Sequence, residues 1–143
     1  MIAVDTNVLV YAHREDSAHH AEARSFLEDV ASSPAPWGIP LQCLVEFVGI
    51  VTHPRIYAPP TPLPTALDAV EALREVPSLR VLTETSESWD GIGSVLRAAK
   101  AKGPRVHDAR IAATCRDHGV REIVTADRRF PRLIGVKVRD LLA

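Results

Sequence analysis

Four acidic residues occupy positions where the neighbouring sequence would favour an apolar side chain. Asp5 ends an apolar run at the start of the chain, and Asp127 follows a second apolar run after one alanine. Glu46 and Asp108 each share a helical face with apolar residues at the spacing i, i+3, i+4 and i+7. A buried carboxylate without a partner costs several kcal/mol, so each of these groups must bind a proton or a cation.

Each acid has an ordinary structural explanation when it is considered alone, because an acid can cap a helix, pair with an arginine or favour a helix N-terminus. Four carboxylates at one site would repel one another unless a divalent cation neutralised them. No His or Cys cluster accompanies them, so the all-oxygen donor set favours Mg²⁺ or Mn²⁺ over zinc. Such an ion completes its shell with substrate phosphate, which predicts a phosphate-bearing substrate. Which acid would orient the attacking water, and whether one ion or two would bind, stays open.

Alternating strand and helix patterns can bring the four acids to one place. Apolar runs predict strands over 1–5, 80–82, 122–125 and 135–138, and a strand or turn over 37–40. Helices are predicted over 6–13 with Thr6 as the cap, from Asp16 or Ser17 to 32–34, and over 41–51, 64–77, 86–100 and 106–118. The alternation predicts one α/β domain over 1–143, with a mostly parallel sheet covered on both faces. Ligands of such sheets bind at the carboxyl ends of the strands.

Charge is unevenly distributed along the 143 residues, whose net charge is −1. Residues 1–96 hold 13 acids and 5 bases, whereas residues 97–143 hold 5 acids and 12 bases. This asymmetry indicates a basic surface that could bind a polyanion, although a solvated charged helix with a basic tail is the simpler explanation.

The composition is that of a soluble globular protein, with 46% apolar and 24% charged residues. The early acid Asp5 argues against a signal peptide, and the longest helical apolar run, 43–51, is too short to cross a bilayer. We therefore expect a cytoplasmic protein without a membrane segment. Cys43 and Cys115 are expected to be buried free thiols.

Three motifs resemble those of PIN-domain ribonucleases. The segment Asp5-Thr6-Asn7-Val8-Leu9 is similar to the opening motif of the family, and segments 106–113 and 125–130 resemble its third and fourth acidic motifs. Glu46 lies in the third predicted helix, where the second acid of the family is expected. Segments 16–20 and 51–56 are similar to VapC-type toxins of type II toxin–antitoxin systems, so the resemblance covers nearly the whole chain.

The resemblance implies a PIN-like three-layer α/β/α sandwich and a Mg²⁺- or Mn²⁺-dependent endoribonuclease that acts as a toxin. It also implies a homodimer that a cognate antitoxin holds inactive, with operator DNA contacted only through that antitoxin. The implied catalytic and metal-binding acids are Asp5, Glu46, Asp108 and Asp127, and the implied supporting polar groups are Thr6, Asn7 and Thr125.

Basic residues adjoin two of the acids. Arg128 and Arg129 follow Asp127 directly and could hold RNA phosphate, with ion pairing or antitoxin contact as an equally good explanation. A turn before Asp108 is flanked by three further cations, Lys100, Lys102 and Arg105. These could steer RNA, although a solvated turn is the simpler explanation.

Three other functions are compatible with parts of the sequence. A phosphatase of the haloacid-dehalogenase kind would use Asp5 as a nucleophile, but it needs a second acid two residues later, where this chain has Asn7. A non-catalytic PIN-like module that binds RNA or protein would be expected to lose acids that this chain keeps. A metal-dependent DNA nuclease is not distinguished by the residues themselves, and only the resemblance favours RNA.

Overall fold

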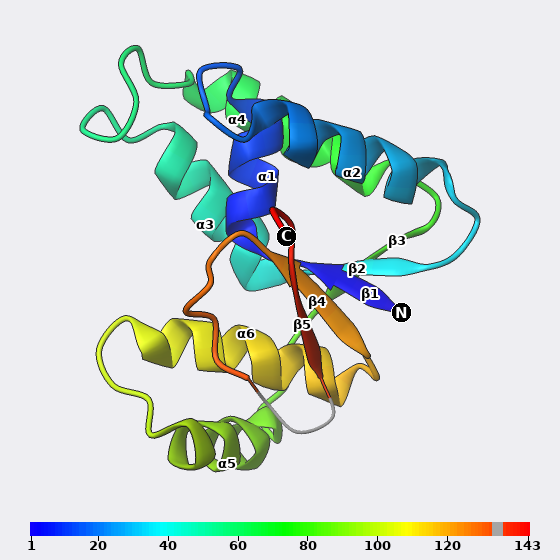
Figure 1. Cartoon of the computed structure of the whole chain (residues 1–143), viewed down its shortest axis with the longest axis vertical. Coiled ribbons are helices and arrows are strands. Elements are labelled where there is room, and N and C mark those ends of the chain that lie inside the picture. The colour runs from blue at the N-terminus through cyan, green and yellow to red at the C-terminus, as the bar shows by residue number, and fades with distance from the viewer. Residues whose placement is uncertain (133–135) are drawn as a thin grey trace.

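A five-stranded sheet forms the centre of the computed structural model, which describes residues 1–132 and 136–143 (Figure 1). The strand order is β3-β2-β1-β4-β5, and every neighbouring pair is parallel. The strands are β1 Ile2–Val4, β2 Trp37–Pro40, β3 Leu79–Leu82, β4 Glu122–Thr125 and β5 Lys137–Asp140.

Helices cover both faces of the sheet (Figure 1). On one side lie α1 Thr6–His13, α2 His20–Ser32, α3 Leu41–Val51 and α4 Leu63–Arg74; on the other lie α5 Ser88–Ala99 and α6 Arg105–Asp117. The prediction of a three-layer α/β/α fold is therefore confirmed. The central strands read as unbroken apolar runs because both of their faces are covered, and Ala3, Val4, Ile123 and Val124 are fully buried.

Several predicted element ends were wrong. Asp5, and not Thr6, caps α1, because its extended backbone lets Oδ1 accept a hydrogen bond from the Thr6 backbone N–H at 2.7 Å. Helix α2 begins at His20 instead of Asp16 or Ser17, because both oxygens of Asp16 accept from the Arg14 guanidinium and the Ser17 hydroxyl accepts from the His19 backbone N–H within a turn. Strand β5 begins at Lys137, and the predicted start of this strand at 135 lies outside the described residues.

The order of the strands creates a topological switch point between β1 and β4. From β1 the chain adds β2 and then β3 on one side, and it then crosses to add β4 and β5 on the other. The connections therefore leave β1 and β4 in opposite directions, and this switch point is where open parallel sheets bind their ligands. Asp5 follows β1 directly, and Thr125 ends β4.

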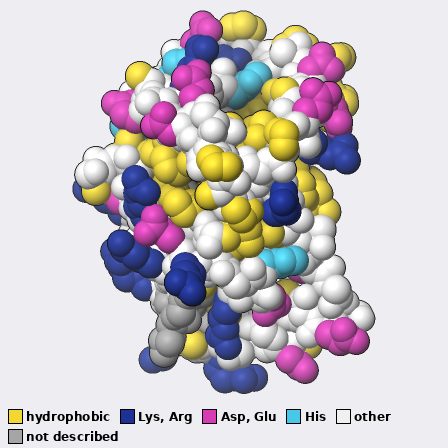
Figure 2. All heavy atoms as spheres, turned by 90° about the vertical axis from the view of Figure 1, so that its right-hand side faces the viewer, with side chains coloured by type: hydrophobic (Ala, Val, Ile, Leu, Met, Phe, Trp, Pro, Cys, Tyr) yellow, Lys and Arg dark blue, Asp and Glu magenta, His cyan; other side chains and the backbone are white. Residues whose placement is uncertain are grey.

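The end of the sheet where the strands begin lies opposite the switch point. Figure 2 views the molecule from this side and shows hydrophobic side chains gathered at the centre, with Lys and Arg side chains toward the lower left. Met1, Ile2, Val30, Pro36 and Trp37 line a shallow hollow there. In the part of the chain that the structure describes, no helix combines the length and apolarity needed to cross a membrane.

Candidate active site at the carboxyl end of the sheet

Asp5 is the most enclosed of the four predicted acids, with 5% of its surface exposed. Both of its carboxylate oxygens are hydrogen-bonded. Oδ1 accepts from the Thr6 backbone N–H and Oδ2 accepts from the Thr125 hydroxyl, each at 2.7 Å. The thiol of Cys43 lies 4.0 Å from Oδ1.

Burial raises the pKa of Asp5 from 3.8 to about 6. The hydrogen bonds from Thr125 and Thr6 oppose this rise, and the nearby charges of Asp108 and Glu46 add to it. Burial likewise raises the pKa of the Cys43 thiol well above its usual value, so this thiol stays neutral beside the carboxylate.

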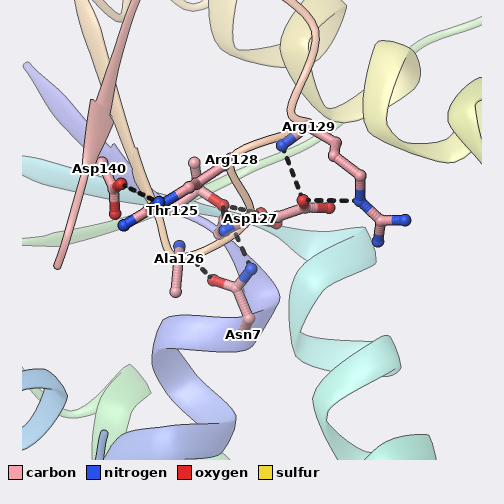
Figure 3. A network of polar contacts seen from close by, with 8 residues as sticks. Asn7, Thr125, Ala126, Asp127, Arg128, Arg129 and Asp140 are labelled. Atoms are coloured by element: carbon pink, nitrogen blue, oxygen red, sulfur yellow. Dashed lines mark hydrogen bonds and ion pairs between the residues drawn. The ribbon is translucent and has the colours of Figure 1, made fainter.

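The Thr125 hydroxyl joins several polar groups at the end of β4. Besides donating to Asp5, its oxygen accepts from Nδ2 of Asn7 at 3.2 Å and from the Asp127 backbone N–H at 3.0 Å. Oδ1 of Asn7 accepts from the Ala126 backbone N–H at 3.0 Å (Figure 3). The first turn of α1 is thereby clamped to the loop that carries Asp127.

Glu46 projects from α3 and is also held at both oxygens. Oε2 accepts from the Thr6 hydroxyl and Oε1 accepts from Nε2 of Gln42, each at 2.8 Å. Gln42 was not among the predicted site residues, although its position four residues before Glu46 on a helix is a signal for such a pair. Gln42 Nε2 lies 3.4 Å from the His107 carbonyl oxygen, which links α3 to α6.

Asp108 lies in the first turn of α6, half-buried. Burial raises the pKa of this carboxyl, and the charges of Asp127 and Glu46 add to the rise. The positive charges of Arg105 and Arg129 oppose it. Asp108 therefore lies within electrostatic reach of acids from both α3 and the loop after β4.

The two arginines that follow Asp127 point in different directions (Figure 3). Oδ1 of Asp127 accepts from the backbone N–H of Arg129 at 2.9 Å and from its Nε at 3.3 Å. Arg128 instead extends toward β5, where its Nε lies 3.4 Å from Oδ2 of Asp140. Of the two predicted phosphate-binding arginines, the fold thus brings Arg129 beside Asp127 and near Asp108, whereas Arg128 lies beside Asp140.

The four acids come from four elements and surround the switch point of the sheet. As they stand, no three acidic, His or Cys side chains within residues 1–132 and 136–143 are grouped closely enough to hold a metal ion. The donor atoms of the four acids are carboxylate oxygens, the type that Mg²⁺ and Mn²⁺ prefer.

A cleft of about 530 Å³ adjoins Glu46 between α3, β3 and α6. Its charged lining residues are Glu46, Glu84 and Arg110, and Arg110 Nε pairs with Glu84 Oε1 at 2.5 Å. The other polar lining residues are Gln42, Thr83, His107 and Thr114. The cleft therefore carries both signs of charge beside the acids.

Comparison with known proteins places this architecture in a defined class. The PIN domain model matches residues 2–135, and the chain belongs to the PIN domain family. Within that family it is similar to ribonuclease VapC43 of Mycobacterium tuberculosis, with 36% identity over 142 residues that make up 99% of this chain and 96% of that protein. Ribonuclease VapC48 of the same organism is 28% identical over 136 residues, 95% and 94% of the two chains.

Solved structures share the fold at lower sequence identity. The crystal structure of Mycobacterium tuberculosis VapC20, described as a sarcin-ricin loop cleaving toxin, has a TM-score of 0.68 at 20% identity and covers 91% of this chain and 92% of its own. VapBC2 from Rickettsia felis, bound to a DNA fragment from its promoter, has a TM-score of 0.69 at 17% identity, with 98% of both chains covered.

Proposed function

We propose that this chain is the ribonuclease toxin of a toxin–antitoxin pair, and that it hydrolyses RNA phosphodiester bonds in a Mg²⁺- or Mn²⁺-dependent reaction. The observation that carries the proposal is the placement of Asp5, Glu46, Asp108 and Asp127 around the switch point of a parallel sheet. Membership of the PIN domain family and the similarity to VapC43 and VapC48, which are named ribonucleases, support RNA as the substrate.

The chemistry of the donor set fits a hard divalent cation, and Asp5, Glu46, Asp108 and Asp127 are the residues that would hold it. The raised pKa values of Asp5 and Asp108 reflect an environment that disfavours unneutralised carboxylates, which a cation would relieve. When bound, such an ion supplies Lewis-acid stabilisation of phosphate oxygens and lowers the pKa of a water.

The role of the surrounding polar groups is to orient the carboxylates. Thr125 and the Thr6 backbone N–H fix both oxygens of Asp5. The Thr6 hydroxyl and Gln42 do the same for Glu46. Side chains held in this way need little reorganisation when substrate binds, which is the main protein contribution to phosphate-ester hydrolysis at a metal site.

The decisive experiment incubates antitoxin-free protein with total RNA, with and without Mn²⁺, beside Asp5→Asn and Asp108→Asn. Asp68→Asn is the matched control, because Asp68 is an exposed acid on α4. We expect discrete, Mn²⁺-dependent cleavage by the wild type and by Asp68→Asn, and its loss in both site variants. Equal cleavage by all variants would indicate a contaminating nuclease.

The alternatives make different predictions in the same assay. A folded protein that binds RNA or a protein partner and cuts nothing would be a non-catalytic PIN-like module. A phosphatase that uses Asp5 would form a trappable aspartyl-phosphate. The position that would carry the second acid of such a phosphatase is Asn7, whose amide is hydrogen-bonded to Thr125 and Ala126.

Partner proteins form the second part of the proposal. Toxin–antitoxin complexes from Rickettsia felis and Klebsiella pneumoniae share this fold, which supports a cognate antitoxin. We propose that the chain dimerises, that its antitoxin inhibits it, and that operator DNA is contacted only through the antitoxin. Light scattering on the chain alone and with its antitoxin would give both stoichiometries, and a monomer in both samples would overturn the dimer.

A further inference from the structure

A further hollow adjoins Asp127, which is hydrogen-bonded to one of its lining residues, Arg129. It has a volume of about 490 Å³ and lies between the loop that joins α5 to α6 and the chain that follows β4. We call it the basic pocket; its lining includes Lys100, Lys102, Arg105, Arg129 and Arg132. No acid is among the described residues that line it.

The basic pocket opens next to the candidate active site. Arg129 lines the pocket and also hydrogen-bonds the carboxylate of Asp127. Arg105 begins α6, one turn before Asp108. Phosphates bound in the pocket would therefore lie close to Asp127 and Asp108.

Of the five cations of the pocket, Arg129 is ion-paired, with Asp127. In the described ranges, no ion pair joins an acid to Lys100, Lys102, Arg105 or Arg132. Such a concentration of positive charge in a concave surface attracts a polyanion. The cleft beside Glu46 differs, because its Arg110 is paired with Glu84. Of the two hollows, the basic pocket therefore carries the greater excess of positive charge.

The lining also indicates which part of a nucleic acid the pocket would contact. Phe130 is the only aromatic residue among the described lining residues, and with 3% exposure it cannot serve as a stacking platform. Lysine and arginine side chains without an exposed ring bind phosphates and carry little base information.

From these features we propose that the basic pocket binds backbone phosphates of the RNA on one side of the scissile bond, independently of base sequence. This inference rests on the proposed function for its substrate, but the pocket can be tested by binding alone. Substrate would then be held asymmetrically, with one flank of the scissile bond anchored by charge.

The test compares two double variants with the same change in net charge. Lys102→Gln/Arg132→Gln removes two exposed cations of the pocket, and Arg24→Gln/Lys137→Gln removes two exposed cations elsewhere. Binding of an unstructured RNA of about 12 nucleotides is measured by fluorescence anisotropy in EDTA over a range of salt. We expect the pocket variant to bind roughly tenfold more weakly at low salt. The slope of log K against log[salt] should fall by about 0.7 for each phosphate that the variant no longer neutralises, while the control variant behaves as wild type.

A second measurement separates this inference from the nuclease proposal. In the wild type, shortening the RNA on one side of the cut site should lower kcat/KM, whereas in the pocket variant the same shortening should have no further effect.

Equal losses of affinity in the pocket and control variants would overturn the inference about the basic pocket while leaving the nuclease proposal intact. If the wild type binds RNA through the pocket but cuts none, the nuclease proposal fails and the pocket stands. Loss of antitoxin binding with unchanged RNA binding would assign the pocket to a protein partner and overturn the inference.

Discussion

The Thr125 hydroxyl donates a 2.7 Å hydrogen bond to Oδ2 of Asp5, a residue 120 positions earlier in the chain. Because the same oxygen accepts from Asn7 and from the backbone of Asp127, one hydroxyl fixes the relation between two of the four acids. It also opposes the effect of burial on the pKa of Asp5. Thr125 is therefore the group whose removal should disturb the site most without removing an acid.

Thr125→Val should lower metal affinity or cleavage by about 10- to 100-fold, the usual effect of losing a group that orients metal ligands. Loss of the hydrogen bond should also raise the pKa of Asp5 further and displace the pH profile of cleavage toward higher pH. Thr52→Val is the control, because the Thr52 hydroxyl bonds only the Val48 carbonyl oxygen among described residues. Wild-type kinetics in Thr125→Val would contradict this role.

The pKa of Asp5 predicts a pH dependence of stability in the absence of divalent ions. Since this pKa is about 6 in the folded protein against 3.8 in its usual state, the native protein holds a proton that the unfolded chain releases between these values. The stabilising contribution is complete below pH 3.8 and lost once the pH passes about 6. The free energy of unfolding should fall by about 3 kcal/mol across this window.

Urea unfolding at a series of pH values, with EDTA present, measures this fall. Asp5→Asn should lack the stabilising contribution of the Asp5 proton. The difference in free energy of unfolding between wild type and variant should therefore change with pH only between pH 3.8 and about 6. Mn²⁺ should stabilise the wild type more at pH 7 than at pH 5, because fewer protons then compete for the carboxylates. Parallel pH curves for wild type and variant would show that Asp5 does not titrate in this way.

Gln42 should act through Glu46. Gln42→Leu removes the donor to Oε1 of Glu46 at similar side-chain volume, and we expect roughly tenfold slower cleavage with little change in thermal stability. In the Glu46→Gln background the same substitution should have much less effect, because the pair acts as a unit. Additive losses in the double variant would mean that Gln42 contributes independently of Glu46.

Arg128 and Arg129 form a natural pair for comparison, because they are adjacent and identical in type. Arg129→Gln should reduce cleavage by roughly tenfold, since its guanidinium adjoins Asp127 and lines the basic pocket. Arg128→Gln should have less than about a twofold effect, because an exposed ion pair such as that with Asp140 contributes little. The measurement is the cleavage rate of each variant on the same RNA substrate. Equal losses in both variants would contradict a separate role for Arg129.

The layered fold was predictable because hydrophobic patterns are long enough to define most elements. Helix α3 was predicted over 41–51 and spans Leu41–Val51, between a strand that ends at Pro40 and a loop rich in proline. Cap residues were less predictable. Asp5 and Thr6 are both good caps, and only the extended backbone of Asp5 decides between them.

Side-chain direction in loops could not be read from sequence. Arg128 and Arg129 are identical in type, and what separates them is the position of β5, which places Asp140 beside Arg128. The grouping of Lys102 with Arg132 likewise depends on two loops that lie side by side only after α6 has packed against the sheet. Such contacts depend on tertiary structure and leave no local pattern.

The pairing of β1 with β4 has a consequence for how this protein is made. The first strand and the fourth lie next to each other in space but are translated far apart in time. A nascent chain that still holds β4 within the ribosome cannot yet bring Thr125 and Asp127 to Asp5. The growing polypeptide therefore cannot bring the four acids together until β4 and the loop after it have left the ribosome, so the proposed nuclease activity would be absent while this part of the chain is being made.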